Sequence, residues 1–426
     1  MHDSLPGALI PVLDGLPGPW GFMALLLFLT FIIHLLLMNA LVGVAVITLV
    51  SKLRILLASP SPISPSREHS QDLLLPKGVA LVVNFGIPPF LFMQCIYSQY
   101  IYPSSVLMAP WWLSVMLVVM LAYYGTYINM TRRGLSDSTR TAALGIAVAL
   151  LLFNAFLFVN NMTLLQNPEQ WTAYARNPGG SFLNLADPQL LPRYLHVILS
   201  CLAVGGLCLA LPEEHALRAL ARKEQQCSSR VETHMQKRRK ALRWFMHASL
   251  LQIPAGLWFF MALEKPQRML FMGGSGIAAA LFMLSLAFFL ASLILARKEK
   301  TYALAMVTVF IIAAMAGMRF ILRQSMLEPY YNPQMRALDA GPLLLFIGSL
   351  ALSAVAMVWL GKVYWRHKAP GRDNASVHGR DAAGPVLEIE RLRERETLLV
   401  LEIAGRSRSD DDDDAYGTKE KEGDKA

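Results

Sequence analysis

The sequence predicts an all-α polytopic membrane protein, a bundle of about nine transmembrane helices. Of its 426 residues 54% are hydrophobic and only 16% are charged, against about 25% charged residues in soluble domains. Long stretches without Asp, Glu, Lys or Arg recur, as in Trp20–Val50, and about 20 such residues cross a bilayer as a helix. The net charge of +9 lies in the loops between these stretches, which is typical of membrane topology and argues against nucleic-acid binding.

The apolar stretches divide the chain into a transmembrane bundle and two flanking segments. An external N-terminal segment covers residues 1–18, the bundle covers 19–365, and residues 366–426 are polar and expected to form a largely disordered cytoplasmic tail. No internal repeat is evident. The nine helices are expected at residues 20–51, 78–99, 109–130, 141–164, 189–211, 241–263, 270–296, 301–323 and 340–364.

The residues between the apolar stretches mark where each predicted helix ends, kinks or begins. Basic residues end the first helix, Pro88-Pro89 predict a kink in the second, and Arg132-Arg133 separate the third from the fourth. Turn signals and aromatic residues fill the segment 167–192 before the fifth helix. A densely basic stretch precedes the sixth helix, and only the short Glu264–Phe271 separates it from the seventh.

The distribution of Lys and Arg predicts the orientation. The first, third, fifth and seventh loops and the start of the tail are rich in basic residues, whereas the even loops are poor in them. Basic loops stay in the cytoplasm. The N-terminus is therefore expected outside and the C-terminus inside.

Three histidines are predicted inside the membrane: His34, His196 and His247. Ionisable side chains at that depth are costly and are functional candidates. Almost no intramembrane carboxylates accompany them, so they indicate metal ligation, with haem iron as the metal, in preference to proton relay. The alternative for each histidine is a hydrogen bond that joins two helices.

A rise of about 1.5 Å per residue predicts two levels for these ligands. His34 comes out roughly 20 Å below the outer face and His247 roughly 10 Å above the inner face, which is a similar height in a core of about 30 Å. These two would share one iron in the middle of the membrane. His196, roughly 10 Å below the outer face, would hold a second iron.

Four residues of the eighth predicted helix accompany the outer site. Met315 or Met318 is the candidate second ligand, because a thioether is an established axial haem ligand. Arg319 and Arg323 are candidates for bidentate binding of haem propionates. Alternatively, the methionines only pack, and the arginines extend to the interface or pair with Glu328.

Two kinked helices suggest a quinone pocket. Gln94 and Tyr97 follow Pro88-Pro89, and Gln252 and Trp258 flank Pro254. A proline frees backbone carbonyls that must face a partner or a cavity, although a packing kink is the simpler alternative. The four cysteines form no C-x-x-C or C-x-x-C-H pattern, which argues against covalent haem, iron–sulfur clusters and a disulfide framework.

The residues Arg193–His196, followed by Ala203-Val204-Gly205-Gly206, resemble the cytochrome bd quinol oxidase subunit I superfamily, of which this chain would be a divergent, oxidase-like member. The resemblance implies that His196 and His34 each ligate a haem b, and it covers about residues 15–365 in topology. Three features depart from the family: the loop Glu264–Phe271 is too short for the quinol lid, acidic residues along the second helix are absent, and Gly317–Gln324 replaces the family's signature.

These inferences lead to one leading hypothesis and two alternatives. The first is a cytochrome with two haem b groups in the bacterial inner membrane, which passes electrons between membrane quinone and a partner redox protein. Its expected partners are membrane lipid and an additional membrane subunit or a periplasmic cytochrome. The alternatives are an oxygen-reducing quinol oxidase subunit I and a non-redox transporter or scaffold. Whether the chain is itself a quinol-dependent oxidoreductase stays open.

Overall fold

The structure is a computed structural model that describes residues 15–57, 68–131, 134–222, 228–328, 330–332 and 336–368. Its long elements are all helices, and nine of those in the described ranges are long and apolar enough to cross a membrane. The predicted fold class is thereby confirmed. Most of the N-terminal segment and residues 369–426 of the tail lie outside the described residues.

The membrane helices extend beyond the predicted apolar stretches, mainly at the end that carries the basic loops. Hydropathy marks only the part of a helix that lies in hydrocarbon, whereas the backbone hydrogen bonds of the helix continue into water. The helices are α1 (Trp20–Leu57), α2 (Glu68–Leu107), α3 (Ala109–Met130), α4 (Asp137–Gln166), α5 (Leu190–Arg222), α6 (Ser228–Ala262), α8 (Gly276–Arg297), α9 (Thr301–Leu327) and α10 (Ala340–Lys368).

Short helical segments replace two of the predicted loops and the start of one predicted helix. A 3₁₀ helix, η2 (Pro168–Arg176), lies between α4 and α5. The predicted helix 270–296 starts later, at Gly276, because α7 (Lys265–Met269) and the π turn η3 (Leu270–Gly274) come first. Gly273 in this turn has a φ of 115°, a conformation open to glycine but strained for other residues.

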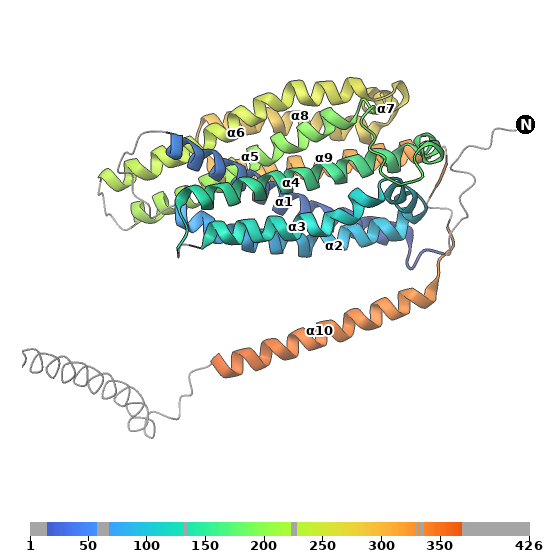
Figure 1. The fold of residues 1–426 in the computed structure, drawn as a ribbon, viewed down its shortest axis with the longest axis horizontal. Coiled ribbons are helices and arrows are strands. Elements are labelled where there is room, and N and C mark those ends of the chain that lie inside the picture. The colour runs from blue at the N-terminus through green and yellow to red at the C-terminus, as the bar shows by residue number, and fades with distance from the viewer. Residues whose placement is uncertain are drawn as a thin grey trace, which may run out of the picture. The chain divides into compact units, whose positions relative to one another are not determined.

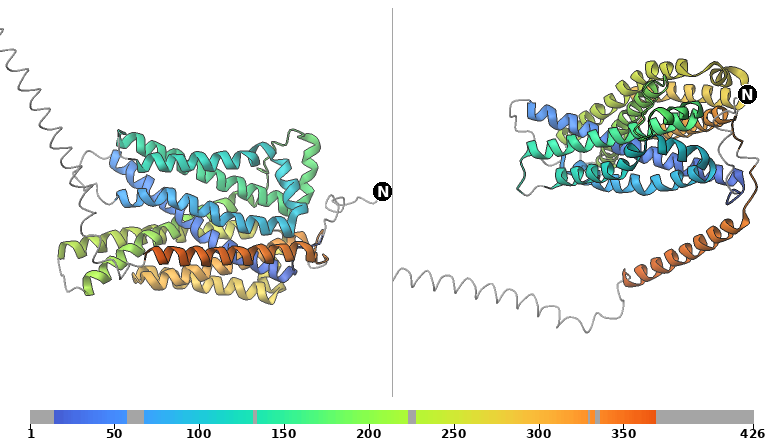
Figure 2. Two further views of the ribbon diagram at one scale, coloured as in Figure 1. Left: turned by 90° about the horizontal axis from the view of Figure 1, so that it is seen from below. Right: turned by 45° about the vertical axis from the view of Figure 1, so that its right-hand side comes forward.

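The bundle consists of two groups of four helices. The first half contains α1, α2, α3 and α4, and the second half contains α5, α6, α8 and α9; within each half the helices pack on their sequence neighbours. Helix α1 runs obliquely between the halves and packs against α5 and α9 (Figures 1 and 2). Helix α10 falls mostly in a separate unit that begins at Leu345.

The two halves are joined where α1 and α5 touch through glycines. A Cβ atom added to Gly43 would lie 1.8 Å from the Cys201 carbonyl oxygen, and one added to Gly205 would lie 2.4 Å from the Gly43 carbonyl carbon. Gly206 gives the next helix the same close approach, since a Cβ there would lie 2.8 Å from the Ala241 carbonyl oxygen of α6. Small residues at crossings let membrane helices approach closely, so α5 is held between α1 and α6.

This contact reveals a short internal repeat that the sequence analysis missed. The segment His34–Gly43 reads HLLLMNALVG, and His196–Gly205 reads HVILSCLAVG. Both segments lie in the first helix of their half, and both next helices carry an Ile-Pro pair, at Ile87-Pro88 and Ile253-Pro254. Only four of the ten positions in the two segments are identical, so the sequence alone does not make the repeat evident.

A buried ion network joins the helices of the first half at the end that carries the basic loops. Asp72 of α2 accepts hydrogen bonds from Lys52 (2.8 Å), Asn129 (2.8 Å) and Arg140 (3.2 Å), while Lys52 also bonds Asn129 (2.7 Å). These residues come from α1, α2, α3 and α4. The network fixes all four helices and neutralises part of their buried charge.

Candidate cofactor sites around two membrane histidines

His34 and His196 occupy equivalent positions on two parallel helices in contact. The hydrogen bond from Cys201 to Asn39 (3.2 Å) joins residues 162 positions apart, and the same offset relates Gly205 to Gly43 and His196 to His34. Each histidine is nine residues before its glycine, about 13.5 Å along the helix axis. The two histidines therefore lie at the same distance along their helices from the α1–α5 contact, which favours one level over the two that the sequence predicts.

The same spacing sends the two side chains in opposite directions. Nine residues at 3.6 per turn are two and a half turns, so each histidine lies on the face of its helix opposite the α1–α5 contact. His34 thus points toward α2 and His196 toward α6, as their neighbours confirm below. The two rings belong to two separate sites, one in each half.

The ring of His34 rests on the backbone of α2. A Cβ added to Gly86 would lie 2.9 Å from its Cε1 and 3.1 Å from its Nδ1, and the imidazole also has a hydrogen-bonding interaction with the backbone of Val82. The Nδ1 atom is buried and has no hydrogen-bond partner among the described residues. Because an unsatisfied buried nitrogen is costly, this ring is a candidate for a ligand outside the described chain.

The ring of His196 has a matching position against α6. A Cβ added to Gly256 would lie 3.5 Å from its Cε1 and 3.6 Å from its Nδ1. Gln252, one turn earlier in α6, donates to the His196 carbonyl oxygen (3.4 Å). Here too Nδ1 is buried and unpartnered in the described part of the chain.

Arg193 adds a positive charge to the His196 site, although it was not among the predicted cofactor-binding residues. It lies three residues before His196 and hence about one turn farther out on a similar face. Its guanidinium lies 5.2 Å from the centroid of the Phe259 ring and donates to the neutral side chains of Gln166 (2.7 Å) and Gln189 (2.9 Å). The sequence could have indicated Arg193, because a basic residue three positions from the candidate ligand His196 lies on a similar face of the same helix.

Helix α9 brings Met318 and Arg319 toward the same region. Met318 packs in one cluster with Phe259 of α6, the residue that Arg193 covers. Arg319 lies 5.1 Å from the centroid of the Phe31 ring of α1, and no hydrogen bond or ion pair is formed by it with another described residue. Its neighbours Arg193 and Arg323 are close enough to repel it electrostatically.

Arg323 lies one turn farther out and is fully enclosed. It is 7% exposed, its guanidinium lies 4.9 Å from the centroid of the Tyr97 ring, and its Nη1 lies 2.8 Å from the Met93 sulfur. Its Nε has no partner in the described ranges, and no ion pair links it to Glu328 there. Three arginines thus gather near the end of the bundle opposite the basic loops, where Asp187 attracts Arg193.

The remaining predicted ligands are not brought into these sites. His247 is exposed on α6 and lies nine residues before Gly256, so it faces away from α5. The expected sharing of one iron by His34 and His247 therefore fails, because His34 faces α2. Met315 is 37% exposed on α9, which leaves Met318 as the better-placed thioether.

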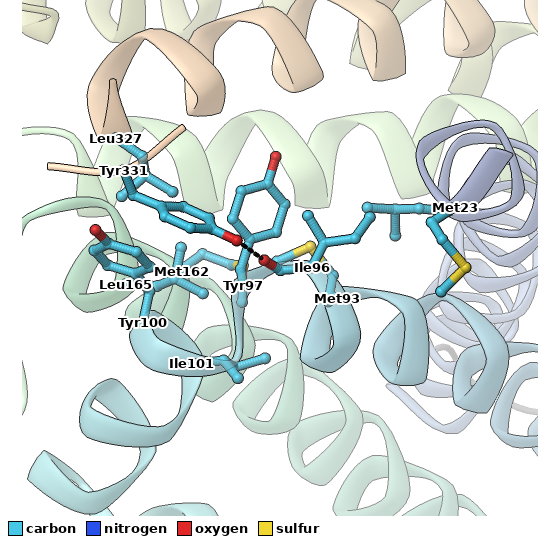
Figure 3. Packing of buried hydrophobic residues seen from close by; sticks show 11 residues of the cluster. Met23, Met93, Ile96, Tyr97, Tyr100, Ile101, Met162, Leu165, Leu327 and Tyr331 are labelled. Carbon is cyan, nitrogen blue, oxygen red and sulfur yellow. Dashed lines mark hydrogen bonds between the residues drawn. The ribbon is translucent and has the colours of Figure 1, made fainter. Parts of the chain in front are cut away.

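The four quinone candidates do not form one pocket in the described structure. Gln94 is exposed, Trp258 is 47% exposed, and Gln252 is engaged with α5. Tyr97 is fully buried at the one non-helical residue of α2 and packs edge-on against Tyr331 (Figure 3). Tyr97 belongs to the buried face of α2 with Met93, Ile96 and Tyr100, whereas Gln94 is on the exposed face.

No protein-family model and no curated protein sequence matches the chain. The assignment of a function therefore depends on the geometry of these two sites.

Proposed function

We propose that the protein is a haem b-containing membrane cytochrome that transfers electrons between membrane quinone and a partner redox protein. The observation that supports this most is the pair of equivalent histidines, each with a ring pressed on a glycine and a buried ring nitrogen without a partner. No group of three His, Cys, Asp or Glu side chains in the described ranges could hold a bare metal ion. A haem needs only one or two protein ligands, because the porphyrin supplies four nitrogens.

The residues around His196 fit the chemistry of a haem. His196 and Met318 are the side chains that would hold the iron. Arg193 and Arg319 would bind the propionates, since guanidinium groups pair with carboxylates through two hydrogen bonds. Bound haem would supply one-electron redox chemistry, while the chain's arginines and packing would set its potential.

The site of His34 has a different environment. Its ring faces Gly86 of α2, and no arginine is in contact with it among the described residues. His34 would hold the second haem in a more apolar surrounding. The two haems would then lie on opposite sides of the α1–α5 pair.

The placement of buried carboxylates favours electron transfer over reduction of oxygen. Asp72, Glu213 and Glu214 are buried, and each bonds to a basic side chain at the end of the bundle that carries the basic loops. Reduction of oxygen consumes protons, and intramembrane proton routes use titratable side chains. Asp72 and Glu214 are engaged in ion pairs, and Glu213 is hydrogen-bonded to His234. A bacterial inner membrane, with a periplasmic cytochrome or a further membrane subunit as partner, belongs to the same proposal.

The test is the haem content of the purified protein and of three matched variants. We expect a reduced-minus-oxidised spectrum of b-type haem and about two haems per chain. His34→Ala and His196→Ala should each remove one haem, because each variant deletes one axial nitrogen. Pyridine haemochrome analysis measures the stoichiometry.

His247→Ala is the control. The sequence predicts the same depth in the membrane for His247 as for His34, but His247 faces away from α5. It should retain both haems and the wild-type spectrum. A protein without b-type haem contradicts the proposal. Loss of a haem in His247→Ala, with full content in His34→Ala, would show that the side chains are assigned to the wrong sites.

A further inference from the structure

The end of the second half that carries the basic loops has a groove along α6 and α8. Its volume is about 740 Å³. Five basic side chains and one acid line its mouth: Lys237, Arg239, Lys240, Arg243, Arg297 and Glu299. Such an excess of one charge in a concave surface creates a strong local field.

The single acid that lines the groove, Glu299, already accepts hydrogen bonds from two arginines. Glu299 accepts a hydrogen bond from Arg239 Nε (2.7 Å) and a second from Arg238. Burial raises the pKa of Glu299, but the hydrogen bonds and charges of Arg238 and Arg239 outweigh this and leave the pKa below its usual value. The carboxylate is therefore ionised at neutral pH, and its charge is used within the protein.

Three other cations of the groove have no such partner. Lys240, Arg243 and Arg297 are exposed, and no carboxylate pairs with them among the residues that the structure describes. In the first half, by contrast, Lys52 and Arg140 both bond to Asp72. The groove thus gathers three unpaired cations in one concave surface, which the ion network around Asp72 does not.

The floor of the groove is apolar and continues into the membrane-spanning surface. Leu242, Met246 and Ala296 line it. Farther along the same helices, Leu250 of α6 is 42% exposed and Ile294 of α8 is 53% exposed. A ligand in the groove would meet cations at one end and apolar side chains at the other, which is the chemical division of a phospholipid.

We propose that this groove binds one anionic phospholipid, with its phosphate at Lys240, Arg243 and Arg297 and its acyl chains along α6 and α8. Basic pockets between membrane helices on the cytoplasmic side recognise anionic head groups. The apolar floor selects a lipid over a free phosphate ion. This site is separate from both histidine sites and does not depend on the proposed electron transfer.

The experiment compares lipids retained by the full-length purified protein in native mass spectrometry. The probes are dioleoyl phosphatidylglycerol, dioleoyl phosphatidylcholine and inorganic phosphate. The wild-type protein should retain phosphatidylglycerol in clear preference to phosphatidylcholine. The variant Lys240→Gln/Arg243→Gln/Arg297→Gln should lose this preference, with each single substitution lowering it about fivefold.

A matched control removes the same charge elsewhere at the same end. The variant Arg54→Gln/Lys77→Gln/Arg222→Gln changes three exposed basic residues outside the groove and should keep the preference. Arg243→Lys/Arg297→Lys, which retains the charge, should keep most of it as well. The single substitutions keep the test independent of the folding of the triple variant.

Three outcomes overturn the proposal. The first is an equal loss of preference in the groove variants and in the control, which would mean attraction by net charge alone. The second is displacement of the lipid by millimolar inorganic phosphate, which would mean a simple anion site. The third is an unchanged preference in all of the groove variants.

Discussion

The two halves of the bundle have the same helix order and the same His-to-Gly spacing, but they differ in where their charged residues lie and in which of these are paired. In the first half Lys52 and Arg140 are bonded to buried Asp72, and no arginine in the described ranges contacts the ring of His34. In the second half Arg193 lies one turn from His196, and the groove of α6 and α8 keeps unpaired cations, while Arg319 of α9 lies over Phe31 of α1, between the halves. One helical framework thus supports two ligand positions with different electrostatic surroundings.

The glycine contact between α1 and α5 should be the place where a substitution lowers stability most. Gly43→Ala or Gly205→Ala places a Cβ within 1.8 or 2.4 Å of backbone atoms, so the helices must separate. We expect the free energy of unfolding to fall by more than about 3 kcal/mol, which is above the usual range for overpacking. The reason is that the neighbouring atoms belong to the backbone and not to a flexible side chain. Thermal unfolding in detergent measures this effect.

Gly21→Ala is the control for this contact, because its added Cβ has no atom within 4 Å. In α1 this change should be neutral or slightly stabilising, since alanine is the better helix former. Equal unfolding temperatures for Gly43→Ala and Gly21→Ala would show that α1 and α5 do not touch through glycines.

The buried network should make the first half more sensitive than the second to loss of an acid. Asp72→Asn leaves Lys52 and Arg140 buried without their carboxylate, and breaking a buried pair costs about 3–5 kcal/mol. Glu299→Gln removes a half-exposed acid, which costs about 1 kcal/mol or less. The two unfolding temperatures, measured at neutral pH, should therefore rank Asp72→Asn well below Glu299→Gln. The reverse order would contradict the contrast between the halves.

The haem potentials should differ between the halves for the same electrostatic reason. Arg193→Gln removes a positive charge one turn from His196 that would favour the reduced, less positive iron, so the potential of the haem proposed at His196 should fall more than that of the haem proposed at His34. A charge about 10 Å away at an effective dielectric constant of 20 contributes about 1.7 kcal/mol, or roughly 70 mV. A redox titration that shows equal shifts of both haems would remove the distinction between the sites.

The smallest expected effect is the pH dependence contributed by Glu299. Its pKa is lowered in the folded protein, so its stabilising effect is present above the normal carboxyl pKa and is lost as the pH falls through the lower, folded value. The difference in unfolding temperature between wild type and Glu299→Gln should therefore disappear in acid. A difference that grows below pH 4 would contradict this assignment.

The sequence predicted the nine helices well because length and hydropathy suffice for a membrane span. It did not predict which faces meet, since lipid is as apolar as the interior of the bundle and leaves the helices without a clear hydrophobic side. His247 illustrates the limit: its depth resembles that of His34, but its face is outward. Arg193 was available from its spacing to His196, whereas no residue pattern indicated the non-helical backbone at Tyr97.

The contact between Gly43 and Gly205 also sets an order of events during biosynthesis. Asn39 and Cys201, which bond across this contact, are 162 residues apart, so at 5–20 residues per second about 8 to 32 seconds separate their synthesis. During that interval the face of α1 that carries Asn39 and Gly43 has no α5 to pack against. The first four helices must therefore reach the bilayer as an unfinished unit, and the arrival of α5 completes it.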